Sequence, residues 1–133
     1  PAPIVIAFSG QRGSTATQIA GVRQRREQLP DRYDALFDQM DALSLAGAAA
    51  LQAGDFDELG ALLNIAHGLL AAIEVSTPEL DAMVGIARAA GAAGAKLTGA
   101  GGGGSVVALC PGNEADVSRA FRSAGFDTLL LAE

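Results

Sequence analysis

Apolar residues form two kinds of pattern along the chain, and together these patterns predict nine secondary-structure elements. Short apolar or β-branched runs between turn residues are typical of strands, whereas apolar residues spaced by three and four are typical of helices. We therefore expect strands at residues 3–8, 95–98, 105–110 and 126–132, and helices at residues 15–29, 31–53, 56–73, 78–90 and 114–124.

Residues that favour helix ends support these boundaries. Ser14 or Thr15 is a suitable N-cap for the first helix, because a side-chain oxygen there can accept a hydrogen bond from a free backbone N–H group. Gly54 is expected to end the second helix, Asp55 to begin the third and Thr77 to cap the fourth. The helices are thus predicted from both periodicity and end signals.

The element order predicts an α+β sandwich. A strand is followed by four helices, a two-stranded hairpin, a helix and a last strand, which favours a four-stranded, mainly antiparallel sheet with helices packed on one face. The 133 residues are a usual length for one domain, so residues 1–133 are interpreted as a single domain. No repeat of 20 to 50 residues is present, which excludes a solenoid.

Composition excludes several classes of partner. The formal net charge is −6 and aromatic residues make up 5% of the chain, so nucleic acid and membrane surfaces are poor partners. No apolar stretch approaches the roughly 20 residues that span a bilayer. Cys110 is the single cysteine, which favours a reducing, cytoplasmic location, and we interpret it as a small apolar side chain rather than a nucleophile.

The most unusual stretch is residues 99–104, with five glycines and one alanine. It matches the dinucleotide fingerprint G-x-G-x-x-G, but that motif needs a helix directly after the loop, and a strand is predicted here. The kinase loop G-x-G-x-x-G-x-V also matches, but the other protein-kinase motifs are missing. A Walker loop fails because Lys96 precedes the glycines rather than following them.

A simple hairpin turn does not require so many glycines. Each additional glycine costs roughly 0.5 to 1 kcal/mol of folding free energy relative to alanine, so the run costs on the order of 2 to 4 kcal/mol. A ligand lying directly against main-chain N–H groups would compensate this cost. We therefore favour a binding role over a flexible turn, and keep the turn as the alternative.

Three segments resemble the GHMP small-molecule kinases, the group that includes galactokinase, homoserine kinase and mevalonate kinase. "GAKLTGAGGGGSVVAL" is similar to the third signature motif of that family. "FSGQRGSTATQIAGVRQRR" and "GLLAAIEVSTPELDAMVGIARAAGAAGAKLTG" are similar to segments of its mevalonate kinases. The resemblance covers essentially the whole chain in the same order.

The resemblance implies the C-terminal, ferredoxin-like domain of such a kinase. The family's N-terminal domain, which carries the ATP loop P-x-x-x-G-L-G-S-S-A and the catalytic residues, is expected to lie outside this chain, in keeping with the start at Pro1 without methionine. The full-length enzyme would use ATP and Mg²⁺ to phosphorylate a small-molecule substrate, and those segments favour mevalonate as that substrate. We expect no catalytic residue and no metal ligand in this domain, and the domain alone should be inactive.

The resemblance also assigns residues that would bind substrate or phosphate. The glycine motif would form a wall of the cleft, Thr15 would face the active site from the strand-to-helix turn, and His67 stands where related kinases often have glutamine. The implied set is Arg12, Ser14, Thr15, His67, Thr98, Gly99, Ala100, Gly101, Gly102, Gly103 and Gly104.

Each of the side chains in this set also has a structural explanation. Ser14 and Thr15 are equally suited to capping a helix, and Arg12 to a solvated loop. A single histidine on an apolar helix, as at His67, is more often hydrogen-bonded within the core. Lys96 would extend from its strand to the surface.

Departures from the family pattern leave the acceptor open. Ala66 replaces an asparagine, Glu74 replaces a glycine and Ser105 replaces a frequent cysteine. A sugar acceptor, as in galactokinase or heptose kinase, is the first alternative to mevalonate. A free-standing ferredoxin-like module that binds a small ligand is the second, and an exposed apolar face could produce a homodimer in either case.

Overall fold

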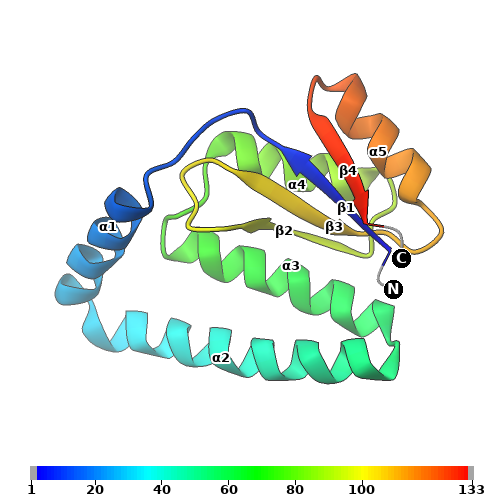
Figure 1. The fold of residues 1–133 in the computed structure, drawn as a ribbon. Helices are drawn as coiled ribbons and strands as arrows, with labels where there is room; N and C mark the ends of the chain where they lie inside the picture. Colours follow the sequence, from blue (N-terminus) through cyan, green and yellow to red (C-terminus); the bar gives the residue numbers. More distant parts are fainter. Residues whose placement is uncertain (1–2, 132–133) are drawn as a thin grey trace.

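The computed structural model describes residues 3–131, which form one sheet and five helices (Figure 1). The elements are β1 (Ile4–Phe8), α1 (Thr15–Gln28), α2 (Pro30–Ala53), α3 (Phe56–Ala72), α4 (Pro78–Ala89), β2 (Gly94–Thr98), β3 (Ser105–Leu109), α5 (Glu114–Ser123) and β4 (Asp127–Leu131). All nine predicted elements are confirmed, with boundaries that differ by a few residues at most. Pro1 and Ala132 lie outside the described residues.

The predicted helix caps are found where the sequence placed them. Ser14 rather than Thr15 caps α1, since its Oγ accepts a hydrogen bond from the N–H of Thr17 at 3.2 Å. Asp55 and Thr77 cap α3 and α4 in the same way. Gly54 ends α2 in the left-handed conformation, at φ 68°.

The four strands form an antiparallel sheet in the order β2-β3-β1-β4. β1 lies between β3 and β4, with Val5 opposite both Ala108 and Leu130. α1 to α4 connect β1 to β2, and α5 connects β3 to β4. This connectivity is that of a ferredoxin-like α+β sandwich and confirms the predicted fold class.

One face of the sheet carries the main core. α4 and α5 cover this face, and their apolar side chains meet the inward-facing residues of the strands (Figure 1). Leu80, Met83 and Phe121 are fully buried there. The opposite face presents Ile6, Val107 and Leu129, and Leu129 remains 49% exposed.

α3 lies alongside β2, the edge strand, rather than over the face of the sheet (Figure 1). Gly60 of α3 and Gly94 of β2 are in main-chain contact, and a Cβ atom added at Gly60 would lie 2.5 Å from the carbonyl oxygen of Ala93. α2 packs against α3, and α1 packs against α2. The helices thus extend the domain beyond the sheet.

α1 differs from its prediction in its burial. The sequence places Ile19, Val22 and Leu29 near one face, yet no residue of α1 is buried, and Ile19 is 53% exposed. The reason is that α1 packs mainly against α2 and meets the rest of the chain through a few side chains, such as Val22 beside Ile73 and Gln18 beside Gly102. Within residues 3–131, no helix combines the length and the apolar character that crossing a membrane requires.

Candidate functional site

The glycine run connects β2 to β3 and packs against the turn that leads from β1 to α1. The N–H of Gly104 donates to the carbonyl of Gln11 at 3.0 Å, and the N–H of Ser9 donates to the carbonyl of Gly104 at 2.8 Å. Gly103 and Gly13 face each other so closely that a Cβ atom added at Gly103 would lie 2.8 Å from the nitrogen of Gly13. Two segments about 90 residues apart therefore touch main chain to main chain.

The other side of the run rests on the link between α3 and α4. The N–H of Gly102 donates to the carbonyl of Val75 at 2.8 Å. A Cβ atom added at Gly101 would overlap that carbonyl, and one added at Gly102 would overlap the side-chain amide of Gln18. The run is therefore held between the β1–α1 turn and Val75.

These contacts give a structural reason for the glycines that the sequence did not reveal. Gly99, Gly101, Gly102 and Gly104 have φ between 72° and 99°, where residues with a Cβ are strained. Gly101 and Gly103 are also needed for the close main-chain approaches. Internal packing thus compensates part of the entropic cost, and a ligand lying against the run stays a prediction.

Only part of the run is free to meet a ligand. Gly102 and Gly104 use their amides for the bonds to Val75 and Gln11. Within the described chain, the amides of Gly99, Ala100, Gly101 and Gly103 form no backbone hydrogen bond to a turn or loop. Of these four residues, Gly99 is exposed, whereas Gly101 and Gly103 are buried.

Arg12, Ser14 and Thr15 lie beside the glycine run, as the sequence predicts. All three are exposed on the turn and first residues of α1, directly next to Gly13. Ser14 uses its hydroxyl oxygen as the helix cap, whereas Thr15 is the first residue of the helix. A helix N-terminus favours anions because its first N–H groups lack partners in the helix.

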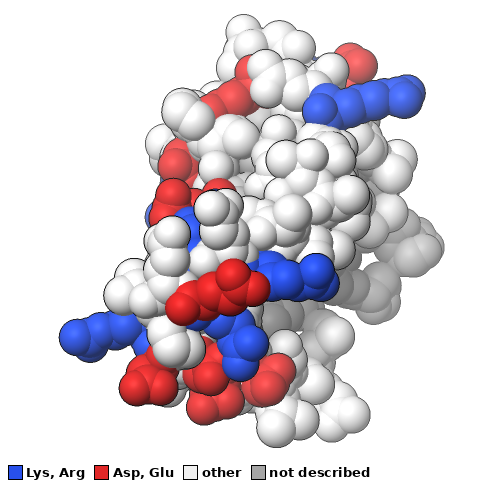
Figure 2. All heavy atoms as spheres, turned by 90° about the vertical axis from the view of Figure 1, so that its left-hand side faces the viewer, with Lys and Arg blue, Asp and Glu red and all other residues white. Residues whose placement is uncertain are grey.

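A groove of about 350 Å³ lies between α1 and the end of α3 with the link that follows it, and Ala100 of the glycine run borders it. Val22, Leu70, Ile73, Val75 and Ala100 supply apolar lining, and Gln18, Ile19, Arg23 and Arg26 line it from α1. Figure 2 views the molecule from the side where α1 and the run lie. Charges of both signs gather over the lower half, and a broad uncharged area lies in the upper half between scattered acidic and basic side chains. Arg23 and Arg26 are the charged residues of the lining, and Arg26 is already paired with Asp34 at 2.7 Å.

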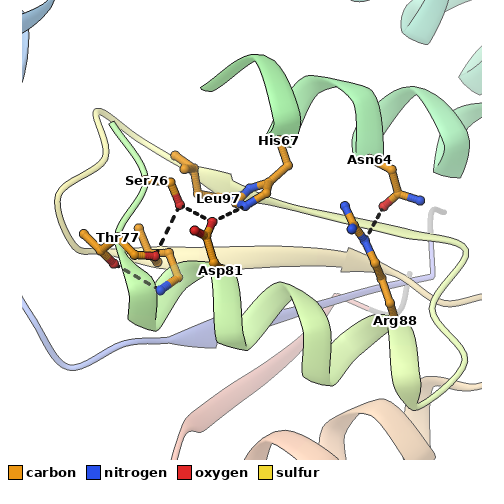
Figure 3. A network of polar contacts seen from close by, with 8 residues as sticks. Asn64, His67, Ser76, Thr77, Asp81, Arg88 and Leu97 are labelled. Carbon is orange, nitrogen blue, oxygen red and sulfur yellow. Dashed lines mark hydrogen bonds and ion pairs between the residues drawn. The ribbon is translucent and has the colours of Figure 1, made fainter. Parts of the chain in front are cut away.

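His67 is not part of this groove lining. The whole residue is 6% exposed, and both ring nitrogens are hydrogen-bonded within the chain (Figure 3). Nδ1 accepts from the backbone N–H of Leu97 at 3.1 Å, so the ring proton is on Nε2 and is donated to Asp81 Oδ1 at 2.8 Å. These bonds agree with the structural explanation for His67, a histidine hydrogen-bonded within the core. The predicted contact of His67 with substrate stays untested.

Asn64, one turn before His67 on α3, completes the link to β2. Its Oδ1 accepts from Arg88 Nε at 2.9 Å (Figure 3) and from the backbone N–H of Ala95 at 3.1 Å. Side chains of α3 therefore satisfy the free N–H groups of an edge strand, which would otherwise be open for pairing.

Lys96 and Cys110 are both held within the fold, and burial changes the pKa of each. Lys96 Nζ donates to the carbonyl of Leu97 at 2.7 Å, and burial lowers the pKa of this ammonium group. Cys110 is fully buried, and burial raises the pKa of its thiol to about 11, so the reactive thiolate is scarce at neutral pH.

Several residues of the region were missed from the sequence. Val75 and Gln11 contribute main-chain carbonyls, which any residue could supply, so no side-chain signal marks them. Gln18 lies against Gly102 and lines the groove. Asn64 and His67 have a signal that could have been used, because Gly60, Asn64 and His67 are spaced by four and three residues and share one helix face.

Comparison with known proteins agrees with this geometry. The family described as "GHMP kinases C terminal" matches residues 48–127, which is more than half of the chain. The chain therefore belongs to the GHMP kinase family and corresponds to its C-terminal domain.

Mevalonate kinases of archaea are similar to most of this chain. The mevalonate kinase of Pyrococcus abyssi is 44% identical over 128 residues, covering 92% of this chain and 38% of that protein. The mevalonate kinase of Methanothermobacter thermautotrophicus is 44% identical over 114 residues, covering 86% of this chain and 38% of that protein. The chain thus spans well under half the length of these relatives.

Solved structures show the same fold. The structure of L. major mevalonate kinase in complex with R-mevalonate matches with a TM-score of 0.87 at 33% identity, over 92% of this chain and 38% of that one. The Methanococcus jannaschii mevalonate kinase matches with a TM-score of 0.79 at 27% identity, over 97% of this chain and 38% of that one.

Proposed function

We propose that the chain is the C-terminal domain of an ATP-dependent kinase that transfers the γ-phosphoryl group of ATP to an alcohol group of mevalonate. The observation that carries the proposal is the contact between the glycine run and the β1–α1 turn, beside the groove, in a chain 44% identical to mevalonate kinases. The rest of such a kinase, with its ATP loop, would supply the remaining part of the site.

The residues of this domain can bind and position the reactants. Phosphoryl transfer depends mainly on positioning and on neutralising charge. Thr15 offers a hydroxyl group at the N-terminus of α1, where an anionic oxygen is favoured. The glycine run offers a wall whose largest side chain is the methyl group of Ala100, and the amide of the exposed residue Gly99 can donate to an oxygen.

The groove supports mevalonate over a sugar as the acceptor. Mevalonate carries a carboxylate and a methyl group, whereas sugars present hydroxyl groups on most carbons. Arg23 at the groove suits the carboxylate, and the lining of Val22, Ile73 and Val75 suits the methyl group. The side chains of Val22, Ile73 and Val75 offer no hydrogen-bond partner to the hydroxyl groups of a sugar.

Within residues 3–131, no group of three or more His, Cys, Asp or Glu side chains lies together. Mg²⁺ in kinases is held largely by substrate phosphates and one or two carboxylates, and we propose that those carboxylates lie in the rest of the kinase. ATP supplies the phosphoryl group, and we expect the rest of the kinase to hold the metal ion and most of the nucleotide.

The test compares the 133-residue chain with the longest polypeptide encoded in the same reading frame. Each is given ATP and Mg²⁺ with mevalonate, phosphomevalonate or galactose, and ADP release is measured. We expect turnover of mevalonate by the longer protein and no turnover by the chain alone. Turnover by the chain alone, or a preference for galactose, would contradict the proposal, and no turnover with any acceptor would favour a binding module.

A matched pair of variants tests the role of Thr15 in the longer protein. Thr15→Ala removes the hydroxyl group beside the glycine run and should lower kcat by about tenfold or more. Thr17→Ala removes an exposed hydroxyl two residues further along the same helix and should change kcat by less than about twofold. Equal effects of the two variants would remove Thr15 from the site.

A further inference from the structure

The glycine run takes its position from one main-chain group in the link between α3 and α4. The carbonyl of Val75 accepts the hydrogen bond from Gly102, and Gly101 packs directly on the same carbonyl. Val75 itself is 4% exposed, and its N–H donates to the carbonyl of Leu70 at 3.2 Å. The orientation of this carbonyl therefore decides where Gly101 and Gly102 can lie.

The carbonyl of Val75 belongs to the peptide group that joins Val75 to Ser76. Because a peptide group is planar, fixing Ser76 also fixes the direction of that carbonyl. Ser76 Oγ donates to Asp81 Oδ1 at 2.6 Å, a short hydrogen bond of the charge-assisted kind (Figure 3). The neighbouring Thr77 is occupied separately, since its hydroxyl oxygen caps α4.

Asp81 is in turn held by α3 and β2. Its Oδ1 also accepts the hydrogen bond from His67 Nε2, and His67 Nδ1 is bound by the N–H of Leu97 (Figure 3). The hydrogen bond from Ser76, followed in strength by that from His67, holds the pKa of Asp81 below its usual value, so the group is a carboxylate at neutral pH. The chain of contacts runs from the sheet edge to the glycine run.

We propose that Ser76 and Asp81 are positioning residues for the glycine run, acting through the carbonyl of Val75. The inference rests on the proposed function, because only a run that lines the kinase cleft makes its position matter for phosphoryl transfer. Neither side chain is expected to touch ATP or acceptor. The competing explanation is that the network only holds α3 against α4.

The first experiment measures hydrogen exchange of the Gly102 amide in the 133-residue chain, relative to amides of β1 and β3. Ser76→Ala should speed exchange at Gly102 by about tenfold while the strands keep their protection. Thr77→Ala, the matched control, removes the cap of the same helix without touching the Ser76–Asp81 bond and should leave the ratio unchanged. Ser76→Thr keeps a hydroxyl group and should restore protection.

Each outcome of this experiment either supports or overturns the inference about Ser76. Unchanged exchange at Gly102 in Ser76→Ala, or equal ratios in Ser76→Ala and Thr77→Ala, would overturn the inference. If Ser76→Ala does not fold, Asp81→Asn replaces it, because the amide keeps the size of the carboxylate and weakens the bond from Ser76. Faster exchange at Gly102 in that variant supports the inference, and unchanged exchange contradicts it.

The second experiment measures turnover of the longer protein and separates this inference from the proposed function. Ser76→Ala should lower kcat by about tenfold with little change in KM for ATP, and Thr77→Ala should stay within about twofold. Wild-type turnover with unaltered kcat in Ser76→Ala would overturn the role of Ser76 and leave the proposed function intact. Absence of wild-type turnover would instead overturn the proposed function, whatever the exchange rates show.

Discussion

Main-chain segments touch through glycines in two regions of this domain, and the two contacts are held differently. At the sheet edge, Gly60 of α3 meets Gly94 of β2, and the buried side chain of His67 lies on the same helix face. At the end of the sheet, Gly101 and Gly103 meet Val75 and the β1–α1 turn next to exposed residues. The first contact joins layers of the fold, whereas the second shapes a surface groove.

The difference indicates which glycines serve stability and which serve the site. A contact surrounded by buried polar groups cannot shift without leaving those groups unsatisfied. Gly101, Gly103 and Val75 are buried as well, but their contact joins loop segments next to exposed residues, so it can shift at the expense of the local geometry. Substitutions at the sheet edge should therefore affect unfolding, and those in the run should affect activity.

The largest effect is expected for Gly94→Ala. The added Cβ atom would overlap the main chain of Gly60, so α3 would have to move away from β2, at about 3 kcal/mol or more of unfolding free energy. Urea denaturation measures this loss. Gly68→Ala on the exposed side of α3 is the control, since nothing lies within 4 Å, and it should stabilise by about 0.5 to 1 kcal/mol. A small effect of Gly94→Ala would mean that the contact is looser than described.

Asn64→Ala should come next, because it removes an acceptor from the same edge. The N–H of Ala95 would lose its partner in a buried position, which costs about 1 to 3 kcal/mol. Asn64→Asp keeps the acceptor oxygen for Ala95 and Arg88 and should cost less. Thermal unfolding of the two variants is the measurement, and equal losses would show that the bond to Ala95 does not stabilise the edge.

In the glycine run, Gly101→Ala should affect activity more than stability. Gly101 and Gly99 share a φ of 89°, so alanine is similarly strained at both, but only at Gly101 does the added atom overlap Val75. We expect kcat/KM of the longer protein to fall by about tenfold more in Gly101→Ala than in Gly99→Ala. If Gly99→Ala is equally impaired, strain rather than contact with Val75 explains the loss.

Asp81 connects the sheet edge to the glycine run through His67 and Ser76. Its titration should therefore change the free energy of unfolding. Hydrogen bonds from Ser76 and His67 lower the pKa of Asp81, so its contribution is fully present above about pH 4 and is lost as the pH falls through the lowered value. The side chain is 55% exposed, which keeps the contribution modest. Wild type should lose its advantage over Asp81→Asn as the pH falls below the usual aspartate pKa of about 4 in denaturation experiments. A constant difference across that range would contradict this assignment.

The smallest effect is expected at Glu74, just before Val75. Glu74 is the non-glycine residue with positive φ among residues 3–131, at 66°, and the family pattern has a glycine at this position. Glu74→Gly should be more stable than Glu74→Ala by about 1 kcal/mol, because both lose the ion pair with Arg25 and only glycine relieves the strain. Calorimetry measures the difference. Equal stability would mean that the strain is already relaxed.

Much of the fold could be predicted because it depends on local patterns. The helix caps at Ser14, Asp55 and Thr77 follow from hydrogen bonds within four residues, and the strands follow from short apolar runs. Arg12, Ser14 and Thr15 do lie beside the glycine run, but their role in binding substrate or phosphate stays a prediction. His67 shows where prediction from local patterns ends, because its position on a helix gives no information on the strand that it contacts.

The sequence by itself determined the order of elements, the α+β class and the motif that relates the chain to GHMP kinases, because periodicity, caps and signature residues are all local. Only the tertiary structure decided three contacts. Gly60 touches Gly94, Asn64 and His67 accept hydrogen bonds from the edge strand β2, and the carbonyl of Val75 accepts one from the glycine run. These contacts join residues 27 to 34 positions apart, and they depend on how helices pack against the sheet rather than on any neighbouring residue.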